Sequence, residues 1–202
     1  RNSEGQALLC GEKNAKIIQG FNLGNSIKEY SEETVKGKIL VFHSTNGTPS
    51  LIKSKFAHNC VVLGFVNMER VANYLLELNE DFIILCAGTN GEFSLEDTVC
   101  GGMLVSRLKK LAGRGKYTLT DSSRGASKLY SAYKNDISKM LHDSEHGQFL
   151  VSLGFSDDLA ACGEVDKYNM LPVLRNGVIK SIEAFASDPK LTMKKVSQKS
   201  AG

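Results

Sequence analysis

The sequence predicts an α/β fold: a three-layer α/β/α arrangement around a mainly parallel or mixed sheet, with a C-terminal β-hairpin. Apolar runs typical of buried strands alternate with helical patterns three times, over residues 38–56, 60–78 and 82–112. A two-residue turn signal, Asn176-Gly177, then separates two short apolar segments. Alternation at this spacing is typical of parallel strands connected by helices, and the turn signal predicts the antiparallel hairpin.

Length and composition are those of an ordinary globular domain. The chain has 202 residues, of which 42% are hydrophobic and 23% charged. It contains neither a long apolar run of the kind that spans a membrane nor an apolar N-terminal signal region. Five cysteines occur without metal-ligand spacing, which favours a reducing compartment. We therefore expect a cytoplasmic protein without a membrane partner.

The net charge of +3 is concentrated at the C-terminus. Residues 187–202 hold four lysines and one aspartate, which equals the excess of the whole chain. The balanced remainder argues against nucleic-acid binding. We expect residues 1–186 to form a single α/β domain and 187–202 to be a flexible basic tail.

The first apolar run, residues 7–10, ends in Gly11-Glu12 and predicts an edge strand that delivers Glu12 to a strand end. A turn-rich stretch follows. There Asn25 and Ser26 either cap a short turn or are loop residues without a function.

The second strand is predicted over residues 38–43. It leads into Ser44-Thr45-Asn46-Gly47, after which Thr48 is expected to cap a helix that begins at Pro49. Hydroxyl groups, an amide and a glycine between a strand and a helix suit an anion. His43 is either catalytic or a packed strand residue.

Residues 60–66 predict another buried strand, followed by a helix over 68–78 that Asn67 caps. Cys60 and Cys86 lie in apolar runs and are expected to be buried thiols.

The most informative stretch runs from residue 82 to residue 102. Residues 82–87 predict a buried parallel strand, and Ser94 with Asp97 forms a capping-box pattern at the start of a helix. The intervening loop has backbone N–H groups suited to an anion. Glu96 and Asp97 add carboxylates that either hold a divalent metal against a phosphate or only complement the helix dipole.

In a parallel sheet, ligands bind beyond the carboxyl ends of the strands. The segments that contain Thr45-Asn46, Asn67 and Gly88 to Asp97 are therefore predicted to lie along that edge and to share one site. Gly101-Gly102, inside the following helix, predicts a close approach by a neighbouring helix or a ligand.

For four further residues, the sequence leaves two alternative roles open. Cys100 is a nucleophile or a packed thiol. His146, Asp158 and Asp166 are site groups, or caps and surface charges. Asp158 lies where Asp157-Asp158 is expected to open a short helix.

Several motifs together resemble one family. They are CGE (10–12), GFNLGNS (20–26), STNGT (44–48), CAGTNGEFSLEDTVCGG (86–102) and SEHG with LGFSDDLAAC and a following Asp166 (144–166). In this order they are similar to the 2-phosphosulfolactate phosphatase family. The resemblance implies an α/β, magnesium-dependent acid phosphatase of coenzyme M biosynthesis that hydrolyses (R)-2-phospho-3-sulfolactate to sulfolactate and phosphate.

With that resemblance, the candidate site has three parts. Mg²⁺ ligands are expected at Glu12, Glu96 and Asp97. Substrate-binding groups are expected at Asn25, Thr45, Asn46, Gly47, Thr48, Gly88 and Thr89. Asp97 or His146 would accept a proton from the attacking water. Lys13, Lys28 and Arg124 are available cations for the sulfonate.

The chain departs from the family pattern at Asn22, Ile27 and His43-Ser44. Members also begin with a strand and an arginine–threonine motif that residues 1–202 lack, so we expect N-terminal truncation. Two alternatives stay open: a phosphatase for another small anionic phospho-hydroxy acid, and a non-catalytic anion-binding member. A homo-oligomer is also compatible with the sequence.

Overall fold

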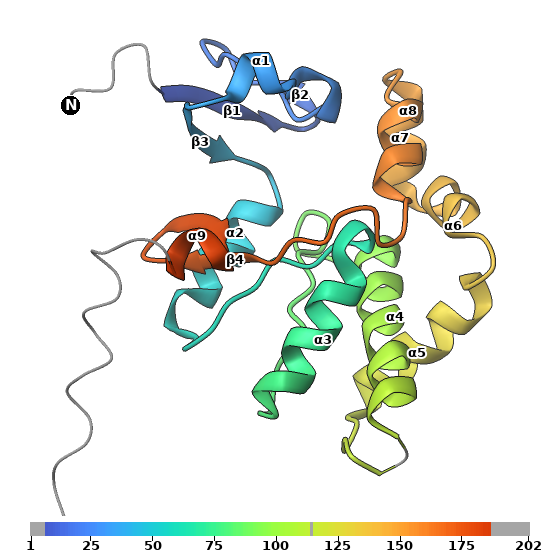
Figure 1. Ribbon diagram of the computed structural model, residues 1–202. Helices are drawn as coiled ribbons and strands as arrows, with labels where there is room; N and C mark the ends of the chain where they lie inside the picture. The colour runs from blue at the N-terminus through green and yellow to red at the C-terminus, as the bar shows by residue number, and fades with distance from the viewer. Residues whose placement is uncertain (1–6, 114, 187–202) are drawn as a thin grey trace, which may run out of the picture.

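The computed structural model describes residues 7–113 and 115–186 and has a mixed α/β fold (Figure 1). The strands are β1 (Ala7–Lys13), β2 (Lys16–Ile17), β3 (Ile39–His43), β4 (Pro172–Arg175) and β5 (Val178–Ser181). The helices are α1 (Glu32–Val35), α2 (Gly47–Lys53), α3 (Met68–Leu78), α4 (Leu95–Ala112), α5 (Asp121–Tyr133), α6 (Ile137–Asp143), α7 (Glu145–Ser152), α8 (Ser156–Cys162) and α9 (Ile182–Ala186). Three 3₁₀ turns cover Ile27–Glu29, Ser54–Phe56 and Phe65–Asn67.

The larger sheet is mixed and has the order β2-β1-β3. β1 pairs with β3 in parallel, from Ala7 opposite Ile39 to Gly11 opposite His43. β2 pairs with β1 in the antiparallel sense. The prediction of an edge strand at residues 7–12 was therefore wrong, because the β2 turn folds back onto the free side of β1.

Gly11 is required where β1 meets β3. Its φ is +132°, and a Cβ there would lie 1.7 Å from the carbonyl oxygen of His43. Only glycine combines this backbone conformation with so close an approach.

The C-terminal hairpin is confirmed. β4 and β5 pair antiparallel, with Arg175 opposite Val178. Asn176 and Gly177 have φ values of +51° and +76°, as a two-residue turn with positive φ at both positions requires.

The strands predicted over 60–66 and 82–87 were wrong, because neither segment is a strand in the described chain. In the first segment, Val61 makes an isolated antiparallel bridge to Val173. In the second, the described residues supply no backbone partner for residues 82–86. Apolar sequence alone does not make a strand when no neighbouring strand is present to pair with it.

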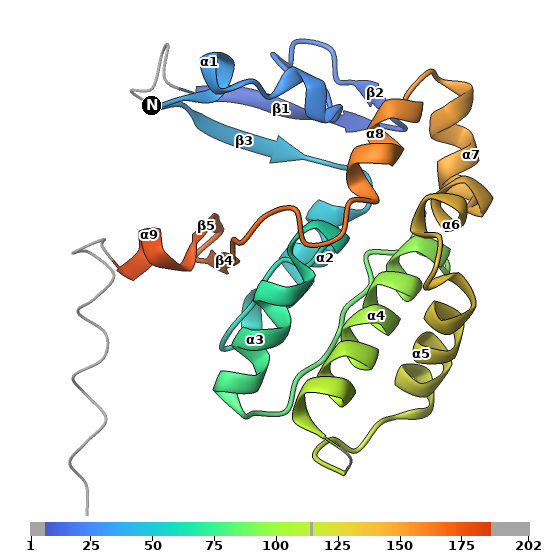
Figure 2. The same cartoon turned by 45° about the vertical axis from the view of Figure 1, so that its right-hand side comes forward.

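The hydrophobic core lies among the helices. α3, α4 and α5 lie side by side at one end of the molecule, and the β2-β1-β3 sheet stands at the other (Figures 1 and 2). Val99 and Leu108 of α4 are buried in the same apolar cluster as Val71 of α3. The predicted helix over 68–78 is confirmed.

The glycine pair in α4 serves helix packing. A Cβ on Gly102 would lie 2.0 Å from the carbonyl oxygen of Ala126 in α5. One on Gly101 would lie 3.2 Å from Cγ2 of Ile84. Of the two alternatives that the sequence left open, the described structure shows close protein packing at these positions.

Helix starts were predicted in part. Ser94 caps α4 by accepting a hydrogen bond from the Asp97 N–H at 3.2 Å. α2 begins one residue before Thr48, after Asn46, and α5 is capped by Thr120. Within the described residues, no helix is both long and apolar enough to cross a membrane. The predicted basic tail, 187–202, lies outside the described residues.

Candidate functional site

One broad cavity of about 2810 Å³ brings the predicted site residues together. It is lined by the loops that follow β1, β3 and residues 82–87, and by α7, α8 and part of the hairpin. Each site residue expected from the sequence lines it: Glu12, Asn25, Thr45, Asn46, Gly47, Thr48, Gly88, Thr89, Glu96, Asp97 and His146. The loops after β1, β3 and residue 87 therefore converge as expected, although residues 82–87 form no strand. Asn67, which was expected at the same edge, does not line the cavity, because its buried side chain bonds to the backbone of Val62, Gly64 and Met170.

Glu12 connects the first two loops. Its carboxylate accepts hydrogen bonds from the Thr45 N–H at 2.7 Å and the Thr45 hydroxyl at 3.0 Å. It also accepts one from the Ala15 N–H at 2.8 Å. Glu12 is only 8% exposed, so these three donors compensate for the burial of its charge. The sequence placed Glu12 at the site but gave no sign of its partners, which lie up to 33 positions away.

The loop after β3 is held by its own hydroxyl groups. Thr48 Oγ1 accepts from the Ser44 N–H at 2.9 Å, and Ser44 Oγ accepts from the Thr48 N–H at 2.9 Å. The backbone N–H groups of Asn46 and Gly47 have no hydrogen-bond acceptor among the described residues. These two adjacent backbone donors can therefore bind an acceptor such as a phosphate oxygen.

The loop after residue 87 is a tight turn. Asn90 and Gly91 have φ values of +55° and +85°, and Thr89 and Glu92 exchange backbone hydrogen bonds of 3.2 and 3.0 Å. The Gly88 N–H donates to Asp97 Oδ2 at 2.8 Å. The backbone donors expected at Gly88 and Thr89 are thus engaged within the loop, and the Thr89 hydroxyl is the group left for a ligand.

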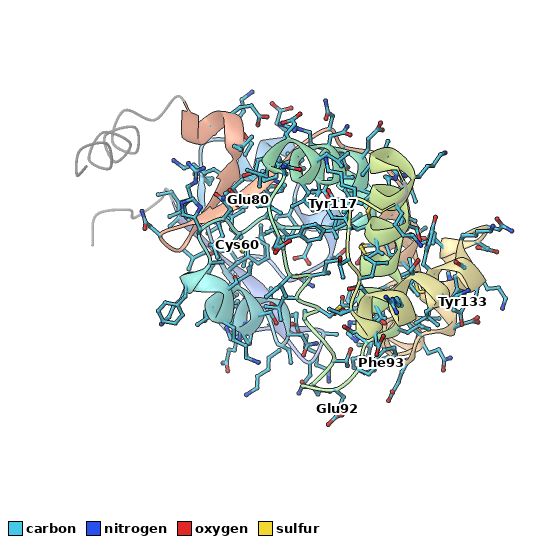
Figure 3. All side chains as sticks on the ribbon, turned by 90° about the horizontal axis from the view of Figure 1, so that it is seen from below. Cys60, Glu80, Glu92, Phe93, Tyr117 and Tyr133 are labelled. Carbon is cyan, nitrogen blue, oxygen red and sulfur yellow. The ribbon has the colours of Figure 1, made fainter. Side chains whose placement is uncertain are left out.

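The two loops meet directly. The Asn90 N–H donates to Asn46 Oδ1 at 2.9 Å. Asp97 is the third residue of α4 and turns its carboxylate to Gly88 rather than back to Ser94. The reciprocal half of the predicted capping box is therefore absent from the described structure, since Gly88 offers Asp97 a donor from outside the helix. In Figure 3, the Glu92 side chain lies at the outer edge of the molecule.

Helices α7 and α8 close another side of the cavity. His146 lines it and lies beside Phe149, with ring centroids 6.2 Å apart. Asp158 also lines it and accepts a hydrogen bond from Ser26 Oγ at 2.9 Å. Asp166 instead pairs with Arg107 and accepts from the Glu69 N–H, so it anchors α3 to α4.

The cations considered for the sulfonate lie elsewhere. Lys28 pairs with Asp157, and Arg124 pairs with Asp121. Neither of them, nor Lys13, lines the cavity.

The site loops are acidic. Glu12, Glu96 and Asp97 line the cavity from these loops, and Glu145 and Asp158 line it from α7 and α8. The basic lining residues come from other segments. These are Lys38, Lys55, Arg175 and Lys180. Since like charges repel, these carboxylates disfavour an anion bound at the site loops without a compensating positive charge.

The carboxylates that line the cavity suit only a metal site in which substrate and water supply some of the ligands. Over the described residues, no group of three or more His, Cys, Asp or Glu side chains is arranged to hold a metal ion. Mg²⁺ is commonly held by one or two carboxylates together with substrate phosphate oxygens and water. Glu96 and Asp97 fit that arrangement, whereas Glu12 already accepts three hydrogen bonds.

The thiols beside Asp97 are poor nucleophiles. Desolvation, and then the nearby charge of Asp97, raise the pKa of Cys100 to about 12. The same two causes raise the pKa of Cys86. A thiol protonated at neutral pH does not attack phosphorus efficiently, which favours the packing alternative for Cys100. Cys60 is half-buried and Cys86 is exposed, so the prediction of two buried thiols was wrong for Cys86, whose segment has no strand beside it.

Comparison with known proteins gives a consistent result. The family model described as 2-phosphosulpholactate phosphatase matches residues 1–177. Relatives named "Probable 2-phosphosulfolactate phosphatase" occur in Caldanaerobacter subterraneus subsp. tengcongensis (36% identical, covering 88% of this chain and 73% of the relative), Thermotoga maritima (39%, 85% and 72%) and Symbiobacterium thermophilum (38%, 90% and 77%). The chain therefore belongs to the 2-phosphosulpholactate phosphatase family.

Proposed function

We propose that this protein is a magnesium-dependent phosphomonoester hydrolase that converts (R)-2-phospho-3-sulfolactate to sulfolactate and phosphate. The observation that carries the proposal is the convergence of the loops after β1, β3 and residue 87 on one cavity. Family membership supports the reaction class, and the names of the relatives support the substrate.

The charge of the site supports a cation requirement. The substrate carries phosphate, carboxylate and sulfonate groups, and the site loops carry several carboxylates. Bound Mg²⁺ would neutralise the phosphate charge and lower the pKa of a water molecule. Glu96 and Asp97 would hold it together with the phosphate.

The chain's own residues would then orient the phosphate. The N–H groups of Asn46 and Gly47 would donate to phosphate oxygens, and the Thr89 hydroxyl would add a donor from the adjoining loop. Glu12 would keep the loop at Thr45 in the required position. Asp97 or His146 would accept the proton of the attacking water.

Phosphate release tests this proposal. We expect the chain to release phosphate from 2-phosphosulfolactate with Mg²⁺ and to stop when EDTA removes the metal. A panel of phosphorylated hydroxy acids without a sulfonate tests the substrate. Equal rates across the panel would contradict sulfonate specificity while leaving the phosphatase class intact. Release that EDTA leaves unchanged would contradict the metal requirement.

A further inference from the structure

Two of the site loops carry the same short sequence pattern. Residues 44–51 read STNGTPSL and residues 88–95 read GTNGEFSL, so threonine, asparagine, glycine, serine and leucine recur in the same order at a spacing of 44 positions. Each copy follows an apolar run and leads into a helix, α2 or α4. We call these segments the first and the second loop copy. The candidate site thus contains two versions of one loop sequence.

The two copies differ in backbone conformation. Asn46 has φ and ψ of −113° and −47°, and α2 begins at the next residue. Asn90 has a φ of +55°, in the left-handed region, and α4 begins only at Leu95. A positive φ is unfavourable for a residue with a Cβ, although asparagine tolerates it better than most. Since the Thr-Asn-Gly sequence is shared, contacts from elsewhere hold the second copy in its turn.

Apolar packing does not supply these contacts. Phe93 is 69% exposed, and Asn90, Gly91 and Glu92 are exposed as well. A segment with so little burial opens easily unless hydrogen bonds hold it. The outer part of the second copy therefore depends on its hydrogen bonds.

Asn46 supplies the bond that joins the two copies. Its Oδ1 accepts from the Asn90 N–H at 2.9 Å. A second link nearby, from Ser50 Oγ to the Ala87 carbonyl, is 3.5 Å long and lies beyond the usual range of a hydrogen bond. The Asn46 side chain makes no capping hydrogen bond to α2. Its acceptor oxygen therefore serves the second copy rather than its own helix.

The second copy in turn contacts Asp97. Thr89 and Glu92 close the turn with two backbone hydrogen bonds, and a Cβ on Gly88 would lie 2.7 Å from the Glu92 carbonyl oxygen. Because the turn is closed and tightly packed, we expect it to move as one unit. The Gly88 N–H donates to Asp97 Oδ2 at 2.8 Å. A continuous series of contacts thus leads from Asn46 to this carboxylate.

We propose that the Asn46 side chain is a positioning residue: it fixes the second loop copy at Asn90 and thereby sets the orientation of the Asp97 carboxylate. The substrate-binding role expected of Asn46 then belongs to its backbone N–H, which stays available to a phosphate oxygen. That Asp97 holds Mg²⁺ rests on the proposed function. The coupling of Asn46 to Asp97 rests on the hydrogen bonds alone.

Amide exchange, measured residue by residue by NMR on the 202-residue chain without added metal, tests the coupling. Asn46→Ala should speed the exchange of the Asn90 and Gly88 amides roughly tenfold or more, because Asn90 loses its acceptor and the released turn carries Gly88 with it. Exchange in α5 should stay unchanged, since the substitution removes no helix cap. Faster exchange at Asn90 with unchanged exchange at Gly88 would overturn the proposal.

Two matched variants each keep the contact. Asn46→Asp retains an acceptor oxygen, so the Gly88 amide should stay protected. Asn90→Gly retains the donating N–H in a backbone conformation that glycine adopts readily, so Gly88 should stay protected there too. Loss of protection at Gly88 in both variants would show that another interaction holds the turn, and would overturn the proposal.

A Mg²⁺ titration separates positioning from a merely structural role. The chemical shift of the Asp97 amide is followed in the presence of inorganic phosphate, so no turnover is needed. Asn46→Ala should raise the half-saturating Mg²⁺ concentration roughly tenfold or more, the usual effect of removing a group that orients a metal ligand. Asn90→Gly should leave it unchanged.

A half-saturating Mg²⁺ concentration that Asn46→Ala leaves unchanged, although Gly88 has lost its protection, would overturn the positioning role. A wild type that binds Mg²⁺ but releases no phosphate from 2-phosphosulfolactate would contradict the proposed function alone. The two results are therefore separable.

Discussion

At the scale of single residues, Glu12 is the site side chain whose loss should lower the free energy of unfolding most. Glu12→Ala removes the acceptor of the Thr45 and Ala15 N–H groups, which lie in a partly buried environment. We expect a loss of about 1–3 kcal/mol in the free energy of unfolding, measured by urea denaturation. Glu12→Gln retains one acceptor oxygen and should lose less.

Glu92→Ala is the matched control for Glu12. Glu92 is exposed, and it is its backbone that makes the hydrogen bonds with Thr89 in the turn. The change should alter the unfolding free energy by less than about 0.5 kcal/mol. If Glu12→Ala is equally neutral, the carboxylate does not organise the loop at Thr45.

Cys100 gives a prediction about pH. Its thiol has a native pKa of about 12 against an ordinary value of 9.0. Between these values the native state keeps a proton that the unfolded chain has lost, so stability falls as the pH rises through this window. The limiting slope for one such group is about 1.4 kcal/mol per pH unit.

Comparison with Cys100→Ala isolates this contribution from other groups that titrate in the same range. The difference in unfolding free energy between the two proteins should shrink with rising pH above 9.0, as the wild-type thiol loses its advantage. A difference that is constant from pH 8 to pH 11 would show that the native pKa is not raised.

At the scale of secondary-structure elements, the contact between α4 and α5 depends on Gly102. Gly102→Ala would place a methyl group 2.0 Å from the Ala126 carbonyl oxygen, which the two helices must separate to accommodate. We expect a loss of roughly 3 kcal/mol, measured by thermal or urea unfolding.

Gly125→Ala is the control on the facing helix. A Cβ there meets nothing within 4 Å, so the better helix propensity of alanine should make the change neutral or stabilising by up to about 1 kcal/mol. If the two glycine variants behave alike, close packing is not the reason for Gly102.

Prediction from sequence worked where local chemistry determines an element. The Asn176-Gly177 turn, the Ser94 cap and the helix over 68–78 depend on neighbouring residues, and each was confirmed. The strand at 82–87 failed because pairing is not local: an apolar run becomes a strand only beside another strand. The partners of Glu12 were missed for the same reason.

At the scale of the whole molecule, the α/β class and the convergence of the site loops were predictable. Both follow from the order of apolar runs and loops along the chain. The separation of the β2-β1-β3 sheet from the helical core (Figure 2) was not predictable, because the sequence does not reveal which strands pair with one another. The roles of the individual site residues stay predictions.

The most direct test of the central claim is phosphate release from 2-phosphosulfolactate by the wild-type chain and by Asp97→Asn, each with Mg²⁺. Asparagine can still accept the Gly88 N–H hydrogen bond, so folding should be retained, as circular dichroism can verify. We predict that wild type and the Glu92→Gln control release phosphate and that Asp97→Asn loses at least a hundredfold in rate. An Asp97→Asn rate equal to wild type, or a folded wild type that releases no phosphate, would contradict the account.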